Sequence, residues 1–398
     1  MSNPDSWPQL AYEEHIWESS AHFWGVNAEY TNTGLRYAAA IPPQIASQSI
    51  SGLNASTLRH AEQATMELIR FDQELGSMIA NFAPVLLRSE SASSSQIENL
   101  SASARAIFSA ELGLIKSRNA EMIAANTKAM EAAIDLAEEI SSGSILKMHE
   151  VLMSSQNIHA PGQWRDEPVW IGTNSHSPHG AEYVAPHSAR VPELVDDLVL
   201  FLQRQDIPPL VQVALVHAQF EAIHPFTDGN GRTGRALAQS TLRHRGITRN
   251  VAMPVSAGLL ADIDGYHQAL TDYRQGKPEA IIQAFSAASL RAVANTRQLV
   301  TEITELRNSW NDRFHARKSS NAWAILDLLM TQPVVTAATA AQHLGVKTPN
   351  VYPPLKALVE AGVLQSKNEH KLGLFWRSDE VLQAIDRFAK RAGKRSKS

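Results

Sequence analysis

The chain has 398 residues, of which 44% are hydrophobic and 19% are charged. These proportions allow sizeable buried cores, exclude a disordered chain and predict two or three domains. The formal net charge of -4 gives no global attraction to nucleic acid or to an anionic membrane. The absence of cysteine excludes disulfides, thiol catalysis and thiolate metal sites.

We also searched the sequence for targeting and membrane segments. The first ten residues contain Asp5 and Pro8 and lack a basic segment followed by an apolar run, so we expect no secretory signal. No uninterrupted apolar stretch reaches the length needed to span a bilayer, so we expect no membrane partner. Together these features predict a cytoplasmic protein.

The first half of the chain is predicted to be helical after a turn-rich arm. Within residues 1–50, Pro42 and Pro43 interrupt any helix, which is typical of an arm that packs on another part of the protein. Apolar residues at helical spacing then predict helices over 57–79, 94–112, 119–140 and 143–152. Between Trp164 and Tyr183, short apolar runs with glycine and proline predict a β-hairpin instead. Further helices are expected over 192–203, 208–223, 235–244, 266–274 and 279–285, with a charged helical stretch to about residue 317.

From residue 321 onward the pattern changes again. Helices are predicted over 322–329 and 335–344, followed by a turn at Gly345, a segment that ends at Gly362 and a two-stranded unit over 363–376. This order of helix, helix, turn, helix and wing is that of a winged helix-turn-helix. Residues 387–398 contain six basic side chains and are predicted to form a solvated tail.

The most informative stretch is residues 224–235, His-Pro-Phe-Thr-Asp-Gly-Asn-Gly-Arg-Thr-Gly-Arg. Gly229 and Gly231 permit backbone angles closed to other residues, so the amides around them can form a concave nest that binds phosphate. A helix that begins near Asn230 would add its positive dipole end and its unpaired N–H groups at the same place. The stretch therefore predicts a phosphate site.

Charged side chains extend this prediction toward nucleotide chemistry. Arg232 and Arg235 are three residues apart and share a helical face, where two guanidinium groups can straddle neighbouring phosphates. Asp228 supplies one hard oxygen for Mg²⁺, which commonly takes one or two carboxylates beside phosphate oxygens and water. Histidine is the side chain best suited to accept a hydroxyl proton near neutrality, which makes His224 the candidate base. The alternative is a plain turn followed by a helix with a solvated arginine pair.

With every fixed position filled, the stretch resembles the signature of the Fic family, His-x-Phe-x-Asp/Glu-Gly-Asn-Gly-Arg-x-x-Arg. The resemblance implies a mainly α fold, in which a Fic helical core carries a β-hairpin flap, with the C-terminal winged helix-turn-helix in addition. It implies transfer of AMP from ATP, with Mg²⁺, to a Ser, Thr or Tyr hydroxyl of a target protein or of the chain itself. The expected segments are an N-terminal arm and helical region over 1–113, a Fic catalytic core over 114–300, a helical linker over 301–319, the winged helix over 320–386 and the basic tail over 387–398.

By motif position, the resemblance implies a role for each residue of the signature. His224 is the implied general base, Phe226 a buried anchor and Asp228 the Mg²⁺ ligand. The remaining residues would hold the phosphate chain of the nucleotide, with the last of them nearest the γ-phosphate: Gly229, Asn230, Gly231, Arg232 and Arg235.

Two further features fit the family less specifically. The hairpin over 164–183 resembles the family's flap, which aligns a target protein by strand addition. Its turn contains His176 and His179, for which a solvent-exposed loop is favoured over a metal site. His217 lies on the helix before the signature, where a core histidine bonded to backbone is favoured over a catalytic one.

Residues 94–99, Ser-Ser-Gln-Ile-Glu-Asn, resemble the inhibitory pattern of the family, Ser/Thr-x-x-x-Glu-Gly/Asn. Ser94 and Glu98 are four apart and are expected on one helical face. The resemblance implies an ion pair between Glu98 and Arg235 that occupies the γ-phosphate position and forces ATP into an unreactive pose. An N-capped helix with a surface glutamate is the alternative. The same glutamate could instead align water for removal of AMP, so transfer and de-AMPylation both stay open.

The winged helix suggests a different class of function, a DNA-binding regulator with a nucleotide-sensing Fic module. The candidate phosphate contacts, besides the basic tail, are Lys347, Lys356, Lys367 and Lys371. Three prolines in the recognition segment, Pro349, Pro353 and Pro354, and the acidic Glu360 argue against base readout by 320–386. The sequence favours protein docking or dimerisation, with a homodimer as one such partner.

Overall fold

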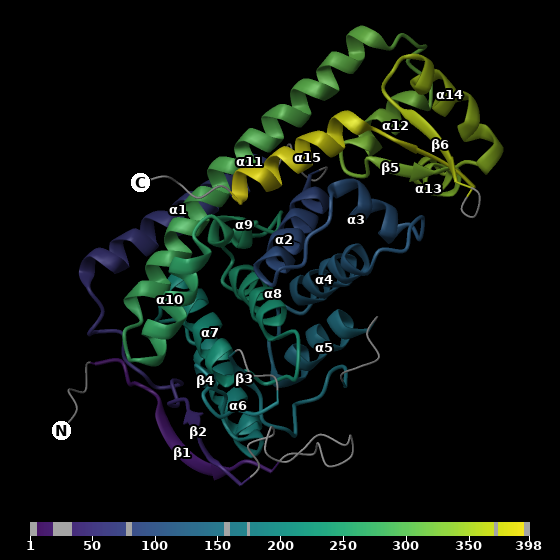
Figure 1. The fold of residues 1–398 in the computed structure, drawn as a ribbon. Coiled ribbons are helices and arrows are strands. Elements are labelled where there is room, and N and C mark those ends of the chain that lie inside the picture. Colours follow the sequence, from purple (N-terminus) through teal and green to yellow (C-terminus); the bar gives the residue numbers. More distant parts are fainter. Residues whose placement is uncertain are drawn as a thin grey trace. The chain divides into compact units, whose positions relative to one another are not determined.

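Helices form most of the protein in the computed structural model, which describes residues 6–18, 34–76, 82–154, 160–172, 176–369 and 373–393 (Figure 1). The predicted fold class, mainly α with small sheets, is confirmed. The chain divides into two units, the first made of residues 1–65, 132–246 and 264–286 and the second of residues 66–131, 247–263 and 287–398. None of the helices in the described ranges combines the length and apolarity needed to cross a bilayer.

The first unit is built around one buried helix, α7 (Pro209–Ile223). Every residue from Leu210 to Ile223 is buried, because apolar side chains occur on all sides of the helix rather than along one stripe. It packs against α6 (Val191–Leu202) and α8 (Asn230–His244), and α5 (Ser142–Met153) packs on both α6 and α8. The unit also holds α10 (Ile263–Arg274) and the first turns of α1 (Ala55–Gly76) and α11 (Glu279–Arg313). The signature therefore begins at the end of its most buried helix.

Two small antiparallel sheets complete the first unit. β1 (Ala11–Ile16) pairs with β2 (Arg36–Ile41), which shows that the arm predicted over 1–50 contains a sheet that the turn signals concealed. β3 (Trp170–Ile171) pairs with β4 (Tyr183–Val184), so the predicted hairpin is confirmed. Residues 173–175 of its turn lie outside the described residues.

The helix predicted over 94–112 is two helices in the second unit, α2 (Ala83–Ile97) and α3 (Ala104–Glu111). Asn99 adopts φ 59° and the Leu100 amide returns to the Ser95 carbonyl at 2.9 Å, which is a Schellman ending. The helix that contains Ser94 therefore ends at Glu98, which is its C-cap residue, and does not continue to residue 112. The physical reason is that asparagine tolerates the left-handed conformation that stops a helix.

Hydrogen bonds between distant segments hold the helices of the second unit together. The Glu90 carboxylate on α2 accepts from the amide of Ser256, at 2.9 Å, and from its hydroxyl, at 2.6 Å, at the start of α9 (Val255–Leu260). Arg88 donates to Glu111 at 2.8 Å and so joins α2 to α3. The unit also contains residues of α4 (Arg118–Asp135), whose Asn126 donates to the Ser91 carbonyl at 3.0 Å.

The C-terminal part of the second unit has the element order expected of a winged helix-turn-helix. The elements are α12 (Ala322–Leu329), β5 (Val334–Thr336), α13 (Ala337–Leu344), η4 (Thr348–Val351), α14 (Tyr352–Glu360), β6 (Gln365–Glu369) and β7 (Gly373–Arg377). The three strands form a sheet in the order β5-β7-β6. Pro353 and Pro354 lie in the first turn of α14, where a missing N–H costs no helical hydrogen bond.

The predicted tail is shorter than the sequence suggested. α15 runs from Asp379 to Ala392, and its buried face includes Phe388 and Ala392. The prediction of a solvated tail from residue 387 is wrong for 387–392, because the apolar residues between the basic ones recur at helical spacing. Residues 394–398 lie outside the described residues.

Candidate active site

The candidate base, His224, is the residue that ends α7. It has φ 50° and ψ 59°, the left-handed conformation, and its amide still donates to the Phe220 carbonyl at 2.9 Å. Only Asn99 shares a positive φ with it among the non-glycine residues of the described ranges. Left-handed backbone is uncommon for any residue other than glycine, and the non-glycine residues that adopt it cluster at functional sites. The conformation turns the chain sharply from the core helix into the signature loop.

The imidazole of His224 has an acceptor beside one of its two nitrogens. Nδ1 lies 3.3 Å from the main-chain oxygen of Glu221 and 3.8 Å from its Oε2. A carbonyl oxygen only accepts, so this contact places the proton on Nδ1 and leaves the lone pair on Nε2. The side chain is 19% exposed, so it can be reached from solvent. His224 thus has the tautomer and the exposure that a general base needs.

Glu221 is a buried carboxylate that lies near two histidines. Its Oε1 is 3.9 Å from His217 Nε2, which in turn lies 2.7 Å from the hydroxyl of Tyr266. His217 is fully buried, so the favoured prediction of a core histidine is confirmed, although its partner here is a tyrosine hydroxyl. A negative charge so close to the ring of His224 would favour the imidazolium form that appears when the base accepts a proton.

The loop from Asp228 to Asn230 forms the start of α8. Gly229 has φ 79°, a conformation that favours glycine, and a Cβ there would crowd Leu152 Cδ2 at 3.1 Å. Its amide donates to Asp228 Oδ1 at 2.7 Å. Gly231 lies in the first turn of α8 and has no positive φ, so the expectation that it needs a backbone angle closed to other residues is wrong. The predicted phosphate nest would therefore rest on one glycine and a helix N-terminus.

Asn230 closes this loop with its side chain. Its Oδ1 accepts from the Phe226 amide at 2.9 Å and its Nδ2 donates to the Phe226 carbonyl at 2.7 Å. Both polar groups of the amide are thus engaged with main chain. The resemblance implied that Asn230 binds phosphate. In the structure its side chain instead bonds to the main chain of Phe226 and stabilises the loop.

The charged groups of the signature differ in their exposure. Arg232 and Arg235 are 3% and 2% exposed, so the alternative of a solvated arginine pair is wrong. The side chain of Asp228 is 40% exposed, and its Oδ2 lies 3.4 Å from Arg232 NH2. Buried guanidinium groups and an accessible carboxylate near a helix N-terminus are groups suited to binding an anion together with a cation.

His149, which the sequence analysis did not single out, supports the loop from α5. Its Nδ1 accepts from the Gly162 amide at 3.0 Å, so Nε2 carries the proton that is donated to the Asp228 carbonyl at 3.1 Å. Its ring stacks on Phe226 with centroids 3.7 Å apart. A lone histidine within a helical pattern gave no signal for this role.

Arg165 is the second residue that sequence reasoning missed. It lies just before β3, is 4% exposed and donates through Nε to the carbonyl of His224 at 2.8 Å. Burial lowers its pKa to about 10, so it stays charged near neutrality. Its partners are mostly main-chain oxygens from segments remote in the chain, and no local pattern marks them.

The flap rests on the same end of α7. The Tyr183 hydroxyl on β4 donates to the Ala222 carbonyl, and the Arg274 guanidinium lies 3.8 Å from the centre of the Tyr183 ring. Burial raises the pKa of Tyr183 above its ordinary value, which keeps the hydroxyl protonated. Ile171 on β3 is 38% exposed. The hairpin is thus anchored through β4 and keeps an exposed apolar side chain on β3.

Ser94 and Glu98 belong to the second unit and the signature to the first. Ser94 is fully buried in the last turn of α2, whereas Glu98 is exposed. Within the described ranges, no group of three His, Asp or Glu side chains is arranged to hold a metal on its own.

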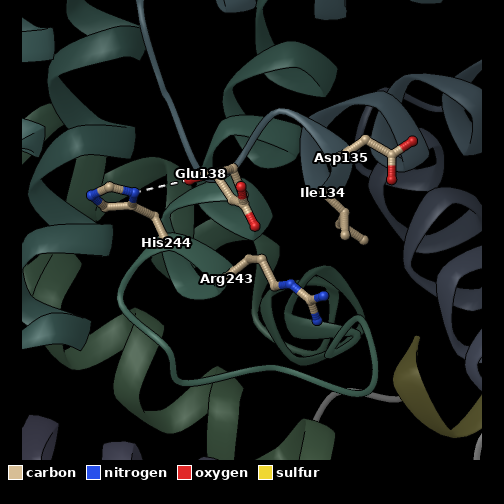
Figure 2. A pocket seen from close by; sticks show the side chains of 6 residues that line it. Ile134, Asp135, Glu138, Arg243 and His244 are labelled. Carbon is tan, nitrogen blue, oxygen red and sulfur yellow. Dashed lines mark hydrogen bonds between the residues drawn. The ribbon is translucent and has the colours of Figure 1, made fainter.

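A separate pocket of about 500 Å³ lies at the other end of α8 (Figure 2). It is lined by Ile134, Asp135, Ala137, Glu138, Arg243 and His244, and His244 Nδ1 donates to the Ala137 carbonyl at 2.9 Å. At about 1.5 Å per residue, His244 lies roughly 20 Å along α8 from the first residue of the helix, Asn230. The pocket takes no part in the site described above.

Comparison with known proteins places this geometry in a family. Residues 139–242 match the Fic/DOC family model, and they contain α5, α6, α7, the flap, the signature and all but the last two residues of α8. The crystal structure of a Fic family protein from Desulfovibrio desulfuricans has a similar fold, with a TM-score of 0.51 and 21% identity over 82% of this chain and 96% of that one. Residues 139–242 thus belong to the Fic/DOC family.

Curated relatives carry an enzymatic name. The chain is 32% identical over 30% of its length to protein adenylyltransferase fic-1 of Caenorhabditis elegans, of which it covers 22%. It is 26% identical over 58% of its length to a probable protein adenylyltransferase of Aquifex aeolicus, of which it covers 65%. The chain therefore spans less than two thirds of the length of these relatives.

Proposed function

We propose that this protein is an adenylyltransferase that moves AMP from Mg-ATP to a Ser, Thr or Tyr hydroxyl of a target protein or of itself. The observation that carries the proposal is the left-handed His224, which joins a buried helix to a loop and helix N-terminus holding two buried arginines. The proposed base and the proposed anion site would thus lie within one short stretch of chain. The adenylyltransferase names of the relatives support the same reaction.

The proposed mechanism begins with the tautomer of His224 that has its lone pair on Nε2. Its Nε2 accepts the proton of the target hydroxyl while that oxygen attacks the α-phosphorus of ATP. The new oxygen–phosphorus bond forms as the bond to the β-phosphate oxygen breaks, so AMP is transferred and pyrophosphate leaves. Glu221 stabilises the imidazolium that results, and Arg232 and Arg235 balance the negative charge of the phosphate chain.

The metal and the nucleotide fit the donors that are present. Asp228 offers an accessible carboxylate beside the helix N-terminus, which suits an ion that also takes phosphate oxygens. When bound, Mg²⁺ would neutralise charge on the phosphates. The main-chain amides at the start of α8 and the two arginines would hold the phosphate chain, while Asn230 keeps the loop in shape.

The flap is the proposed docking place of the target protein. β3 pairs with β4 on one side, and the exposed Ile171 offers an apolar contact for a segment laid along the other. Strand addition would supply main-chain hydrogen bonds with little sequence preference. The proposal predicts that target recognition tolerates many sequences around the modified hydroxyl.

Labelled ATP tests the reaction directly. We expect label from the α-phosphate, and none from the γ-phosphate, to be retained on protein. His224→Ala should lower the rate about 100- to 10,000-fold, as expected for loss of a general base, while ATP still binds. Retention of the γ label would show kinase-like transfer. Equal rates for wild type and His224→Ala would exclude His224 as the general base.

We further propose that Glu98 restrains the enzyme by competing with the γ-phosphate for Arg235, as the inhibitory pattern suggests. Glu98 lies exposed at the C-cap of α2. The hydrogen bond from Arg88 to Glu111 holds α2 against α3, so the Glu98 carboxylate extends from a helix that is packed in place. A charge-assisted contact with a guanidinium can be bidentate and can compete with a phosphate.

Replacing this carboxylate gives the second test. Glu98→Gly and Glu98→Gln should both increase self-labelling in Mg-ATP about tenfold or more, since one charge-assisted contact is worth roughly 1.5–3 kcal/mol. Asn99→Gly is the matched control, because it adds a glycine at the adjacent left-handed position and leaves the carboxylate in place. An equal rise in Asn99→Gly, or a rise in Glu98→Gly without one in Glu98→Gln, would assign the effect to the backbone of the helix end rather than to the carboxylate. Release of AMP from a pre-modified target by the wild type would instead favour de-AMPylation.

A further inference from the structure

Arg165 joins the two ends of the flap to the turn that carries the base. From its place before β3, it donates to two carbonyls of the turn, His224 at 2.8 Å and Ile223 at 3.4 Å. It also donates to Glu167 O at 3.1 Å, before β3, and to Pro186 O at 2.6 Å, after β4. Its own amide donates to the carbonyl of Pro225 at 3.0 Å. One side chain thus connects three segments of the first unit.

Only a guanidinium group suits this arrangement. Its donors point outward from a rigid plane, so they reach acceptors on opposite sides at the same time. A lysine ammonium is one nitrogen on a flexible stem and cannot span the same carbonyls. Each of the three guanidinium nitrogens of Arg165 donates to at least one of these main-chain carbonyls, which assigns the side chain to holding main chain rather than phosphate.

We infer that Arg165 is a positioning residue for the transfer step: it holds the flap, and with it the target hydroxyl, at a fixed distance from the imidazole of His224. This inference rests on the proposed transferase function. Transfer requires the hydroxyl, the imidazole and the α-phosphorus to be aligned, and a misplacement of 1 Å can cost about 100-fold in rate. ATP binding depends on the start of α8 and not on this clamp.

The test compares Arg165→Ala and Arg165→Lys with a matched control in the full chain. Arg204→Ala is that control, because Arg204 also donates to main-chain carbonyls, Gln48 O at 2.7 Å and Ala46 O at 3.3 Å, but joins other segments. We expect Arg165→Ala to lower kcat for AMP transfer about 100-fold while the Kd for ATP changes less than about twofold. Arg165→Lys should recover little of the rate, and Arg204→Ala should keep it.

Added guanidinium ion separates positioning from general destabilisation. Millimolar guanidinium should raise the transfer rate of Arg165→Ala at least about tenfold, because the ion can occupy the space left by the side chain and has the same donors. Urea at the same concentration, and guanidinium added to Arg204→Ala, should have no such effect. Parallel loss of ATP binding and transfer, or absence of rescue by guanidinium, would overturn the inference.

Amide hydrogen exchange tests the clamp without relying on AMP transfer, so it separates failure of the clamp from failure of the proposed reaction. In Arg165→Ala the amides of Glu182 and Ala185, which donate to Ile171 O and Val169 O, should exchange faster, while the amide of Thr233 on α8 should not change. If wild type transfers no AMP, the proposed function fails, and unchanged flap exchange would also exclude the clamp.

Discussion

At the scale of single residues, the site depends on side chains that shape main chain as much as on those that carry charge. His224 is held in a left-handed conformation, and Asn230 bonds the Phe226 main chain on both sides. His149 reaches the Asp228 carbonyl from α5. These contacts fix the loop before any ligand arrives, which reduces the ordering that nucleotide binding would otherwise require.

Gly229 offers a test of this preorganisation. Gly229→Ala should destabilise the protein by about 2–3 kcal/mol, because it combines a left-handed strain of about 1–2 kcal/mol with a Cβ that crowds Leu152 Cδ2 at 3.1 Å. Gly362→Ala is the control, since its φ is also positive, at 73°, and an added Cβ would meet nothing within 4 Å. Urea unfolding measures both. Equal losses in the two variants would show that crowding by α5 contributes nothing.

At the scale of elements, ion pairs tie the N-terminal sheet to the rest of the first unit. Glu13 on β1 accepts from Arg190 at 2.9 and 2.7 Å, in the turn before α6. These hydrogen bonds are the main reason that the pKa of Glu13 falls from 4.5 to about 2. The neighbouring pair, Glu14 with Arg36 at 2.7 Å, lies within the sheet and is largely exposed.

A pH dependence of stability follows from the Glu13 pair. A carboxyl group with a lowered pKa stabilises the folded state above its unfolded pKa of 4.5, and this contribution is lost as pH falls toward about 2. Because the pair is partly solvated, we expect about 1 kcal/mol rather than the full value of the shift. Urea unfolding at pH 6 and pH 3 should show a smaller pH dependence in Glu13→Gln than in wild type. Glu14→Gln should behave like wild type, and an equal effect in both variants would contradict the assignment.

At the scale of the whole molecule, the charge pattern bears on the role of the C-terminal elements. We propose that they serve protein docking or dimerisation. Lys347, Lys356 and Lys367 are exposed, but Lys356 lies 3.7 Å from Glu360 on the same helix, which reduces the positive charge of α14. Lys371 lies outside the described residues. The net charge of -4 adds no general attraction to DNA.

Gel shifts with short duplexes test this proposal. We expect no sequence-selective retention, and we expect any weak binding to disappear as salt rises. Glu360→Lys should increase that weak binding without making it selective, because a phosphate contact carries no sequence information. If the wild type retained one sequence selectively and Lys356→Glu abolished this retention, the result would favour the alternative function, a DNA-binding regulator.

The sequence by itself determined what depends on neighbouring residues. The signature, the helical class and the hairpin over 164–183 were all predicted, because helical spacing, strand alternation and turn chemistry act over a few residues. The Schellman ending at Asn99 is also local, and its Asn-Leu pair was a signal that could have been used.

Only the tertiary structure decided what depends on segments that are far apart in the chain. It brought Arg165 onto the carbonyls around His224 and His149 onto the loop, and it buried both signature arginines. It also paired the strands Ala11–Ile16 and Arg36–Ile41 across an intervening stretch of chain. These outcomes depend on which acceptors and apolar surfaces meet in space, and no periodicity of a single segment encodes that meeting.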